Sequence, residues 1–420
     1  MCNILVYKKG IQLNKKLFHD YPRGINYKHW ENKDWMFEFM RLPFVGYQSS
    51  PYTKDGNIVI MFNGEIYNHR NLTSFSSELE TIYYLYTKDK KSLFYLHLLK
   101  GEFVYVIYDA SYPRFILYRS KPGVVPFYYS KNVMSTYRLT GSQKALEPGV
   151  YTILYPDKIK KIIKDYEVGL YLPDMNYFKS ILEDTLISYV LHDTVPLFFV
   201  SYSGGLDSSI ILYLLRQFQP TAISVAYKNT IESEFLSKVK PILKEHGIKL
   251  EIVYLDFDKV KEAHCNMHQL IDVQNPVKFR GAVRNYWVAK KAHYLAEGPV
   301  AVVGGEGADE LFGGYPFFNT QDRLLRKKLQ VQAIHSMQSI NLDRTNLVPY
   351  LFNVEWRVPF LEQRIIQYAL MHDVVYPNKQ FLWKFKDKFV PLPVLKNKYN
   401  DEEKITVQYL NKIKKEVKCF

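Results

Sequence analysis

The spacing of apolar and polar residues changes character along the chain. In the first part, short apolar or β-branched runs are separated by Gly, Pro or Asp, a pattern that predicts strands. These runs lie at residues 2–7, 35–47, 57–62, 102–109, 114–119 and 125–129. A helical stripe stands among them at residues 77–88. This part therefore predicts a layered α/β or α+β domain with much sheet.

The second part alternates strands with helices. Helical stripes lie at residues 177–190, 209–218, 232–246 and 284–296, and apolar runs between them lie at 195–200, 222–227, 250–255 and 300–303. Such alternation predicts a parallel, doubly wound sheet. The segment 156–176, with Pro156, Gly169 and Pro173, reads as a connector. We therefore expect two domains, at residues 2–165 and 177–420.

Composition and charge narrow the class of protein. The chain has 420 residues and 47% hydrophobic content, enough for two domains with their own cores. It has neither an apolar run of 18 residues nor a basic-then-apolar leader, so we expect a cytoplasmic protein with no membrane partner. The net charge is +14, but the basic residues are spread along the chain, which favours a solvated surface over nucleic-acid binding. The three cysteines are too scattered for a disulfide framework.

A glycine-rich segment after the predicted strand 195–200 indicates a phosphate site. It reads Ser203-Gly204-Gly205-Leu206-Asp207-Ser208-Ser209 and opens a helix. This geometry directs backbone N–H groups and the positive end of a helix at an anion. The serine hydroxyls add donors, and Asp207 can hold Mg²⁺. The segment lacks the lysine of the GxxxxGK[ST] loop and is similar to the pyrophosphate-binding loop of ATP pyrophosphatases.

A second cluster follows the predicted strand 300–303. It reads Gly304-Gly305-Glu306-Gly307-Ala308-Asp309-Glu310-Leu311-Phe312-Gly313-Gly314-Tyr315. Glycines lose much backbone entropy on folding, and neighbouring carboxylates repel each other. Binding of a metal–nucleotide complex would offset both costs. The alternative is an acidic surface turn.

The first part carries a candidate nucleophile, Cys2, directly behind Met1. Removal of Met1 would leave a thiol and a free α-amine on Cys2, so that one residue supplies both the nucleophile and the base. Asn63-Gly64 follows a predicted strand, and its amide and N–H groups can form an oxyanion hole. Alone, Asn-Gly is more often a hairpin turn. Together these motifs suggest one protein that cleaves an amide and consumes a nucleotide.

The order of the motifs resembles that of glutamine-hydrolysing asparagine synthetases. The resemblance rests on Cys2, Arg41-Leu42, Asn63 to Asn68, Arg119 with Gly123 and Pro126, and the two glycine-rich segments. It implies an N-terminal-nucleophile glutaminase domain followed by a doubly wound, ATP pyrophosphatase-like synthetase domain. In such proteins ammonia from glutamine attacks an aspartyl-adenylate, and the products are asparagine, glutamate, AMP and pyrophosphate.

The resemblance also implies roles for individual residues. Cys2 would attack the glutamine amide, and Asn63 with Gly64 would hold the oxyanion. The residues that would bind glutamine are Arg41, Leu42, Pro43, Phe44, Val45, Asn63, Gly64, Glu65 and Glu78. Glu78 stands where the family has an aspartate for the glutamine amino group, so the charge is kept with a longer reach.

The implied cofactors are ATP and Mg²⁺. The ATP-contacting set would be Ser201, Ser203, Gly204, Gly205, Asp207, Ser208, Val225, Gly304 and Gly305. Asp207 and Asp309 match metal–pyrophosphate positions, Glu306 matches a position needed for adenylate formation, and Lys379 matches a catalytic lysine.

The acceptor segment departs from the family. Residues 272–286 lack the Thr pair of the Thr-Thr-x-Arg aspartate motif. Arg280 and Arg284 are the candidate cations, and Arg284 is favoured because it opens the predicted helix 284–296. We expect glutamine, ATP and aspartate as small-molecule partners, and a homodimer as the candidate assembly. Two alternatives stay open: an amide-forming enzyme that acts on another carboxylate, and a degenerate relative with a binding or regulatory role.

Overall fold

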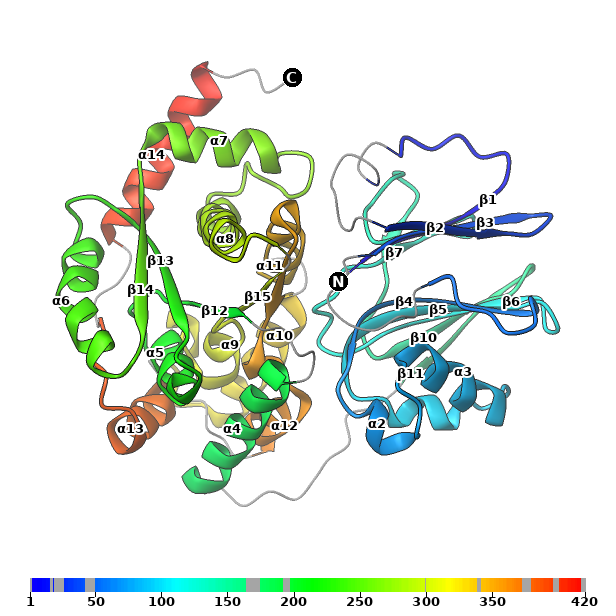
Figure 1. The fold of residues 1–420 in the computed structure, drawn as a ribbon, viewed down its shortest axis with the longest axis horizontal. Helices are drawn as coiled ribbons and strands as arrows, with labels where there is room; N and C mark the ends of the chain where they lie inside the picture. The colour runs from blue at the N-terminus through cyan, green and yellow to red at the C-terminus, as the bar shows by residue number, and fades with distance from the viewer. Residues whose placement is uncertain are drawn as a thin grey trace. The chain divides into compact units, whose positions relative to one another are not determined.

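The structure is a computed structural model, and it divides the chain into two compact units, Met1–Glu167 and Val168–Phe420 (Figure 1). It describes residues 2–15, 18, 26–41, 50–163, 174–191, 197–298, 300–337, 341–371, 379–395 and 400–416. Leu42, Pro43, Phe44 and Val45 of the predicted glutamine pocket lie outside the described residues. No helix in these ranges is both long and apolar enough to cross a bilayer.

The first unit contains two antiparallel sheets. One has the spatial order β2 (Asn26–Glu31), β3 (Trp35–Arg41), β1 (Asn3–Lys8), β8 (Val133–Ser135), β7 (Tyr128–Tyr129) and β9 (Lys144–Ala145). The other has the order β11 (Ile159–Ile163), β10 (Val150–Leu154), β6 (Arg114–Arg119), β5 (Gly101–Asp109) and β4 (Ile58–Ile66). The sheets pack through aromatic side chains, with ring centroids 4.5 Å apart for Trp35 and Phe115.

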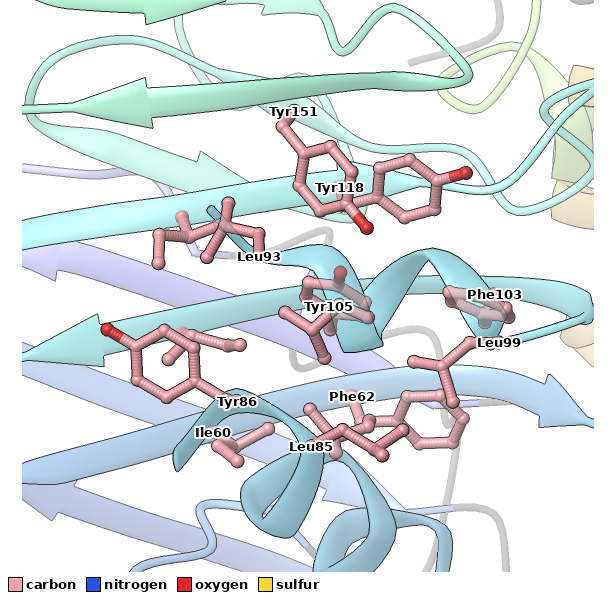
Figure 2. Close-up of a cluster of buried hydrophobic side chains, with 14 of the residues drawn as sticks. Ile60, Phe62, Leu85, Tyr86, Leu93, Leu99, Phe103, Tyr105, Tyr118 and Tyr151 are labelled. Carbon is pink, nitrogen blue, oxygen red and sulfur yellow. The ribbon is translucent and has the colours of Figure 1, made fainter. Parts of the chain in front are cut away.

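A helical layer covers the outer face of the second sheet. It comprises α2 (His69–Leu72), α3 (Glu78–Lys88) and the 3-10 helix η1 (Phe94–Leu98). Figure 2 shows side chains of α3, including Leu85 and Tyr86, facing Ile60 and Phe62 of β4 in one buried cluster. Removal of such apolar surface from water is worth about 25 cal/mol per Å². This cluster therefore holds α3 firmly against the strand that carries Asn63 and Gly64.

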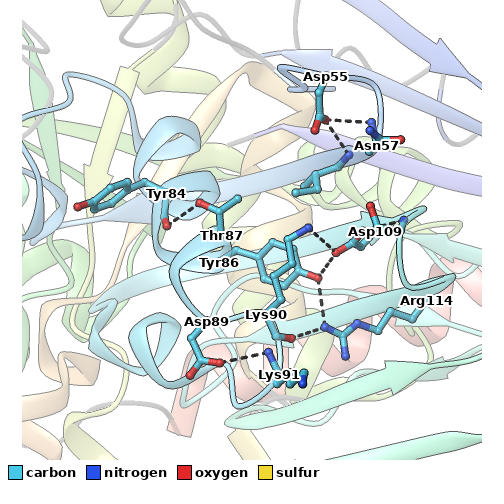
Figure 3. A network of polar contacts seen from close by, with 12 residues as sticks. Asp55, Asn57, Tyr84, Tyr86, Thr87, Asp89, Lys90, Lys91, Asp109 and Arg114 are labelled. Atoms are coloured by element: carbon cyan, nitrogen blue, oxygen red, sulfur yellow. Dashed lines mark hydrogen bonds and ion pairs between the residues drawn. The ribbon is translucent and has the colours of Figure 1, made fainter.

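A buried polar network lies at the other end of β4 and β5 from Asn63 and Gly64 (Figure 3). The Asp109 carboxylate, which is inaccessible to solvent, accepts a hydrogen bond of 2.7 Å from the Tyr86 hydroxyl and lies 3.3 Å from Lys90 Nζ. Arg114 Nη2 donates to the same hydroxyl at 3.2 Å. Because buried charges need partners, these contacts tie α3 to β5 and β6.

The second unit is built on a five-stranded parallel sheet. Its spatial order is β14 (Lys249–Leu255), β13 (Thr221–Tyr227), β12 (Phe198–Ser201), β15 (Val300–Val303) and β16 (Val354–Arg357). The longer helices α6 (Ile231–Glu245) and α8 (Pro276–Ala296) pack on β13 and β14, and Figure 1 shows them on opposite faces. This confirms the predicted doubly wound parallel sheet.

The remaining helices surround this sheet. They are α4 (Met175–Leu191), α5 (Leu206–Leu214), α7 (Phe257–Met267), α9 (Ala308–Phe312), α10 (Arg323–Met337), α11 (Asp343–Leu347), α12 (Gln363–Met371), α13 (Gln380–Phe389) and α14 (Asn400–Glu416). The chain leaves β12 toward β13 and later returns to β15 on the other side of β12. In such sheets, ligands bind outside the carboxyl ends of the strands at this reversal.

Two local predictions were wrong. The connector 156–176 contains β11, whose Ile159 and Ile163 pair with the two ends of β10. The helix expected at 284–296 begins at Pro276, because the Asn275 side chain accepts from the N–H groups of Val277 and Lys278 and caps it. Arg284 therefore lies inside α8 and does not open it.

Candidate active sites

Cys2 lies against Asn63 in the first unit. The backbone nitrogen of Cys2 donates to Asn63 Oδ1 at 2.6 Å. Since Oδ1 faces this donor, Nδ2 of Asn63 is turned away from it. Within the described residues, Nδ2 is buried and has no hydrogen-bond partner. A buried donor of this kind is suited to an oxyanion that develops next to the thiol.

Gly64 continues β4 beyond Asn63. It pairs with Phe103 of β5 and has a φ of +115°. A Cβ at this position would lie 2.0 Å from the carbonyl oxygen of Glu102, so only glycine fits. Asn63-Gly64 therefore lies inside a strand, and the hairpin-turn interpretation of this dipeptide is wrong.

Charged residues approach the same strand ends. Arg41 ends β3, and the register of Asn3 with Met40 places Arg41 beside the start of β1, where Cys2 lies. Glu78 begins α3, and its Oε1 accepts from the backbone N–H of Ile66 at 2.5 Å. Glu65 follows Gly64 in β4. The described part of the predicted glutamine set thus gathers around Cys2 and the end of β4.

The predicted phosphate loop joins β12 to α5 in the second unit. Gly204 has a φ of +73°, and a Cβ on it would lie 2.7 Å from Phe235. Gly205 is the N-cap of α5 and has no side chain to cap the first N–H groups. The hydroxyl oxygens of Ser203 and Ser208 lie 3.2 Å apart at the same place. Backbone and hydroxyl donors therefore converge on one small region, as an anion site requires.

Lys379 connects the two predicted metal ligands. Its Nζ lies 2.5 Å from Asp207 Oδ2 and 2.7 Å from Asp309 Oδ1. Burial alone would lower the pKa of Lys379, but the two carboxylates raise it well above its ordinary value, so the side chain is a cation. Gly314 makes room for this contact, because a Cβ there would lie 1.8 Å from Asp309 Oδ1 and 2.5 Å from Lys379 Cε.

The two aspartates also fit a magnesium ion. Mg²⁺ in nucleotide sites is held by one or two carboxylates together with phosphate oxygens and water. Asp207 and Asp309 belong to the segments that follow β12 and β15. Gly305 lies in the same segment as Asp309, and a Cβ on it would lie 3.1 Å from the Cβ of Asp207, so the two segments pack closely together. The donor set therefore suits a metal that is shared with a nucleotide.

Glu306 is oriented by Trp356, a residue for which the sequence indicated no role. Trp356 Nε1 in β16 donates to Glu306 Oε2 at 3.0 Å. A Cβ on Gly304 would lie 2.2 Å from that oxygen and 2.4 Å from Trp356 Nε1. The glycine and the indole together fix the carboxylate at the end of β15.

Glu310 is a buried carboxyl next to this site. It accepts hydrogen bonds from the Tyr315 hydroxyl at 2.7 Å and from Asn341 Nδ2 at 2.8 Å. Burial, with a smaller effect from Asp309, raises the pKa of Glu310 from its ordinary value of 4.5 to about 7. Ionisation of Glu310 therefore opposes folding.

We expect Glu310→Gln to remove a pH dependence of stability. Because the folded-state pKa is the higher one, the contribution of Glu310 to the free energy of unfolding is greatest below about pH 4.5 and falls as pH rises to about 7. The variant should gain roughly 2–3 kcal/mol over wild type at pH 8 and little at pH 5. Urea unfolding at both pH values measures this. Glu245→Gln, on the exposed face of α6, is the control; an equal gain at both pH values would contradict the assignment.

A small cavity lies beside the phosphate loop. Ser201, Ser203 and Val225 of the predicted ATP set line it, together with Arg284 and Glu402. Arg284 forms an ion pair with Glu402 of α14, whose side chain is 3% exposed. Arg280 pairs with Glu403 of the same helix at 2.8 Å. Both arginines that the sequence suggested for the acceptor are therefore held by α14.

Comparisons with known proteins match both units. Residues 8–168 match the glutamine amidotransferase domain family, and residues 191–348 match the asparagine synthase family. A probable glutamine-hydrolysing asparagine synthetase of Dictyostelium discoideum is 26% identical over 418 residues, 87% of this chain and 73% of that protein.

Two further relatives give the same picture. Asparagine synthetase B of Escherichia coli is 25% identical, over 86% of this chain and 72% of that protein. A putative asparagine synthetase of Methanocaldococcus jannaschii is 27% identical, over 80% and 69%. The expected resemblance and fold class are thus confirmed. This chain is therefore similar over most of its length to the glutamine-hydrolysing asparagine synthetases, with a match to the glutamine amidotransferase domain family followed by a match to the asparagine synthase family.

Proposed function

We propose that this protein is a glutamine-dependent asparagine synthetase, an ATP-dependent carbon–nitrogen ligase. It converts aspartate, glutamine and ATP to asparagine, glutamate, AMP and pyrophosphate through a β-aspartyl-adenylate. The observation that carries the proposal is the convergence of Asp207, Asp309 and Lys379 at the carboxyl ends of β12 and β15. The pairing of Cys2 with Asn63 supports the glutaminase half.

In the glutaminase reaction, the α-amine that Met1 removal exposes takes the proton of the Cys2 thiol. The thiolate attacks the side-chain amide carbon of glutamine, and Asn63 Nδ2 with the Gly64 N–H stabilises the oxyanion. The ammonium returns its proton to the leaving nitrogen, ammonia departs, and water hydrolyses the thioester to glutamate. Arg41 binds the glutamine carboxylate and Glu78 its ammonium group, which keeps the amide aligned with the thiol.

In the synthetase reaction, a carboxylate oxygen of aspartate attacks the α-phosphorus of ATP and pyrophosphate leaves. The negative charge that develops on pyrophosphate is stabilised by the N–H groups at the start of α5, the hydroxyls of Ser203 and Ser208, and the Lys379 ammonium. Asp207 and Asp309 would hold Mg²⁺, which supplies further neutralisation of that charge. Ammonia then displaces AMP from the adenylate beside Glu306.

The proposal is tested by release of pyrophosphate against a panel of amino acids and other carboxylates, with ammonia supplied. Aspartate-dependent release with asparagine as product supports it. A response to a different carboxylate alone would favour the alternative amide-forming enzyme. Absence of release with every acceptor would favour the regulatory alternative, and ADP with phosphate as products would mean that the phosphate loop had been misinterpreted.

We expect Glu78→Ala to raise the glutamine KM by about 10-fold or more, because a charge-assisted contact to the ammonium group is lost. Glu78→Asp should keep or lower that KM, since aspartate matches the family residue. The ammonia KM should not change in either variant. Steady-state kinetics with each nitrogen donor measures this, and Glu80→Ala in the same helical turn is the control. An unchanged glutamine KM in Glu78→Ala would remove this residue from the site.

A further inference from the structure

The C-terminal helix α14 packs on α7 and α8 of the second unit (Figure 1). One face of it is buried, because side chains at a spacing of three or four residues are at most 3% exposed: Glu402, Thr406, Leu410 and Ile413. Both matched family ranges, 8–168 and 191–348, end before α14 begins. The role of this helix therefore follows from its own contacts.

Helix α14 rests on the carboxyl end of β13. The hydroxyl oxygens of Tyr227 and Thr406 lie 3.0 Å apart, and the rings of Tyr227 and Tyr409 pack with centroids 5.8 Å apart. Tyr227 is the last residue of β13 and follows Val225 of the predicted ATP set by two positions. Since ligands bind at the carboxyl ends of the strands in such sheets, α14 lies beside the nucleotide site.

The chain just before α14 contacts the phosphate loop. The backbone N–H of Leu395 donates to the carbonyl oxygen of Gly204 at 2.9 Å. A Cβ on Gly204 would lie 3.8 Å from the Cβ of Leu395, so the two backbones pack closely. The loop that is suited to pyrophosphate and the segment that leads into α14 are thus joined directly.

Glu402 brings α14 to the wall of the small cavity beside this loop. Ser201, Ser203 and Val225 line the cavity, and Arg284 of α8 and Glu402 complete it. The Glu402 carboxylate is buried and forms an ion pair with Arg284. A buried charge that loses its partner is strongly destabilising, so this pair fastens α14 to α8 at the cavity.

A neighbouring ion pair between the same two helices offers a contrast. Arg280 Nη1 lies 2.8 Å from Glu403 Oε2, but the Glu403 side chain is 57% exposed. Within the described residues, neither partner lines the cavity. Exposed ion pairs contribute little to stability because water screens them. Glu402 therefore differs from Glu403 both in burial and in its contact with the site.

We propose that α14 closes the nucleotide site, and that docking of α14 and binding of the nucleotide stabilise each other. Glu402 is the positioning residue that couples the two events, because it holds Arg284 in the cavity wall. Such coupling is reciprocal, so a bound nucleotide must also stabilise the docked α14. The inference rests on the proposed function in one respect, that the cavity takes part of a nucleotide.

Hydrogen exchange of the full chain tests the coupling directly. The probe is an ATP analogue whose α–β bridge cannot be cleaved, added with Mg²⁺. At saturation it should slow exchange of the α14 amides by about 10-fold or more, because opening of α14 then requires loss of the nucleotide. Amides of α3 in the first unit are the internal control and should not change. Equal exchange of α14 with and without the bound analogue would overturn the proposal.

Calorimetric titration of the same analogue tests Glu402. Glu402→Leu and Arg284→Met should each raise its Kd by about 10-fold or more, since each leaves one buried charge alone. The double variant should return to within about threefold of wild type, because a buried ion pair can be replaced by apolar side chains without loss of packing. Glu403→Gln is the matched control and should stay within about twofold.

Two results of this titration would contradict the assignment. A wild-type Kd in both single variants would remove the pair from the site. A double variant as weak as the single ones would mean that Arg284 contacts the nucleotide itself and that docking of α14 is not the cause.

Both measurements are made without turnover, which separates the inference from the proposed function. If the analogue protects α14 and wild type makes no asparagine, the proposed function fails and the inference stands. If wild type makes asparagine while Glu402→Leu keeps the wild-type Kd and exchange pattern, the inference fails and the proposed function stands.

Discussion

Cys2→Ala should abolish asparagine synthesis from glutamine and leave synthesis from ammonia within about twofold of wild type. Removal of the nucleophile typically costs roughly 10³-fold or more in rate, whereas the synthetase site needs ammonia alone. The buried Asn63 Nδ2 has no role when the thiolate is absent, so oxyanion stabilisation does not rescue the reaction. Assays of asparagine formation with each nitrogen donor measure the effect.

The matched control is Cys265→Ala, a half-buried cysteine on α7 of the second unit. It should keep both activities. The intact mass of the purified protein is measured first, because the mechanism requires that Met1 has been removed. Equal loss of the two activities in Cys2→Ala would show that this residue is not the glutaminase nucleophile.

Asp207→Asn should abolish synthesis with both nitrogen donors. The substitution removes one charge from the pair that Lys379 bridges and from the carboxylates suited to Mg²⁺. Pyrophosphate then leaves with less neutralisation, which we expect to cost about 3–5 kcal/mol of transition-state stabilisation, or roughly 10²- to 10⁴-fold in kcat. Ammonia-dependent pyrophosphate release is the measurement.

Asp258→Asn, an exposed carboxylate in the first turn of α7, controls for loss of one negative charge in the same unit. Glutaminase activity should persist in both variants, because the nucleophile lies in the other unit. Pyrophosphate release at the wild-type rate in Asp207→Asn would contradict the assignment of this carboxylate to the phosphate site.

Local elements could be predicted from the sequence where one pattern dominates. The apolar runs at 114–119 and 300–303 form β6 and β15 with the predicted bounds, and the stripe at 77–88 forms α3. Predictions failed where a local cue was misleading. The segment 156–176 resembles a connector but contains β11, because β10 supplies the pairing that its own residues do not reveal.

The sequence by itself determined the motifs and their chemistry: a cysteine behind the initiator methionine, two glycine-rich segments after strands, and the carboxylates within them. The tertiary structure decided which of these motifs lie close together. Lys379 and Asp207 are 172 positions apart, and the position of β12 between β13 and β15 brings the loop of Asp207 next to that of Asp309. Strand order depends on long-range packing, which no local pattern encodes.

The same reason applies to the arginines. Arg280 and Arg284 have equal charge and reach in the sequence, and a predicted helix start favoured Arg284. The fold decided what each of them contacts, because α14 supplies a carboxylate to both. Whether a cation is neutralised or available depends on the partners that folding brings to it.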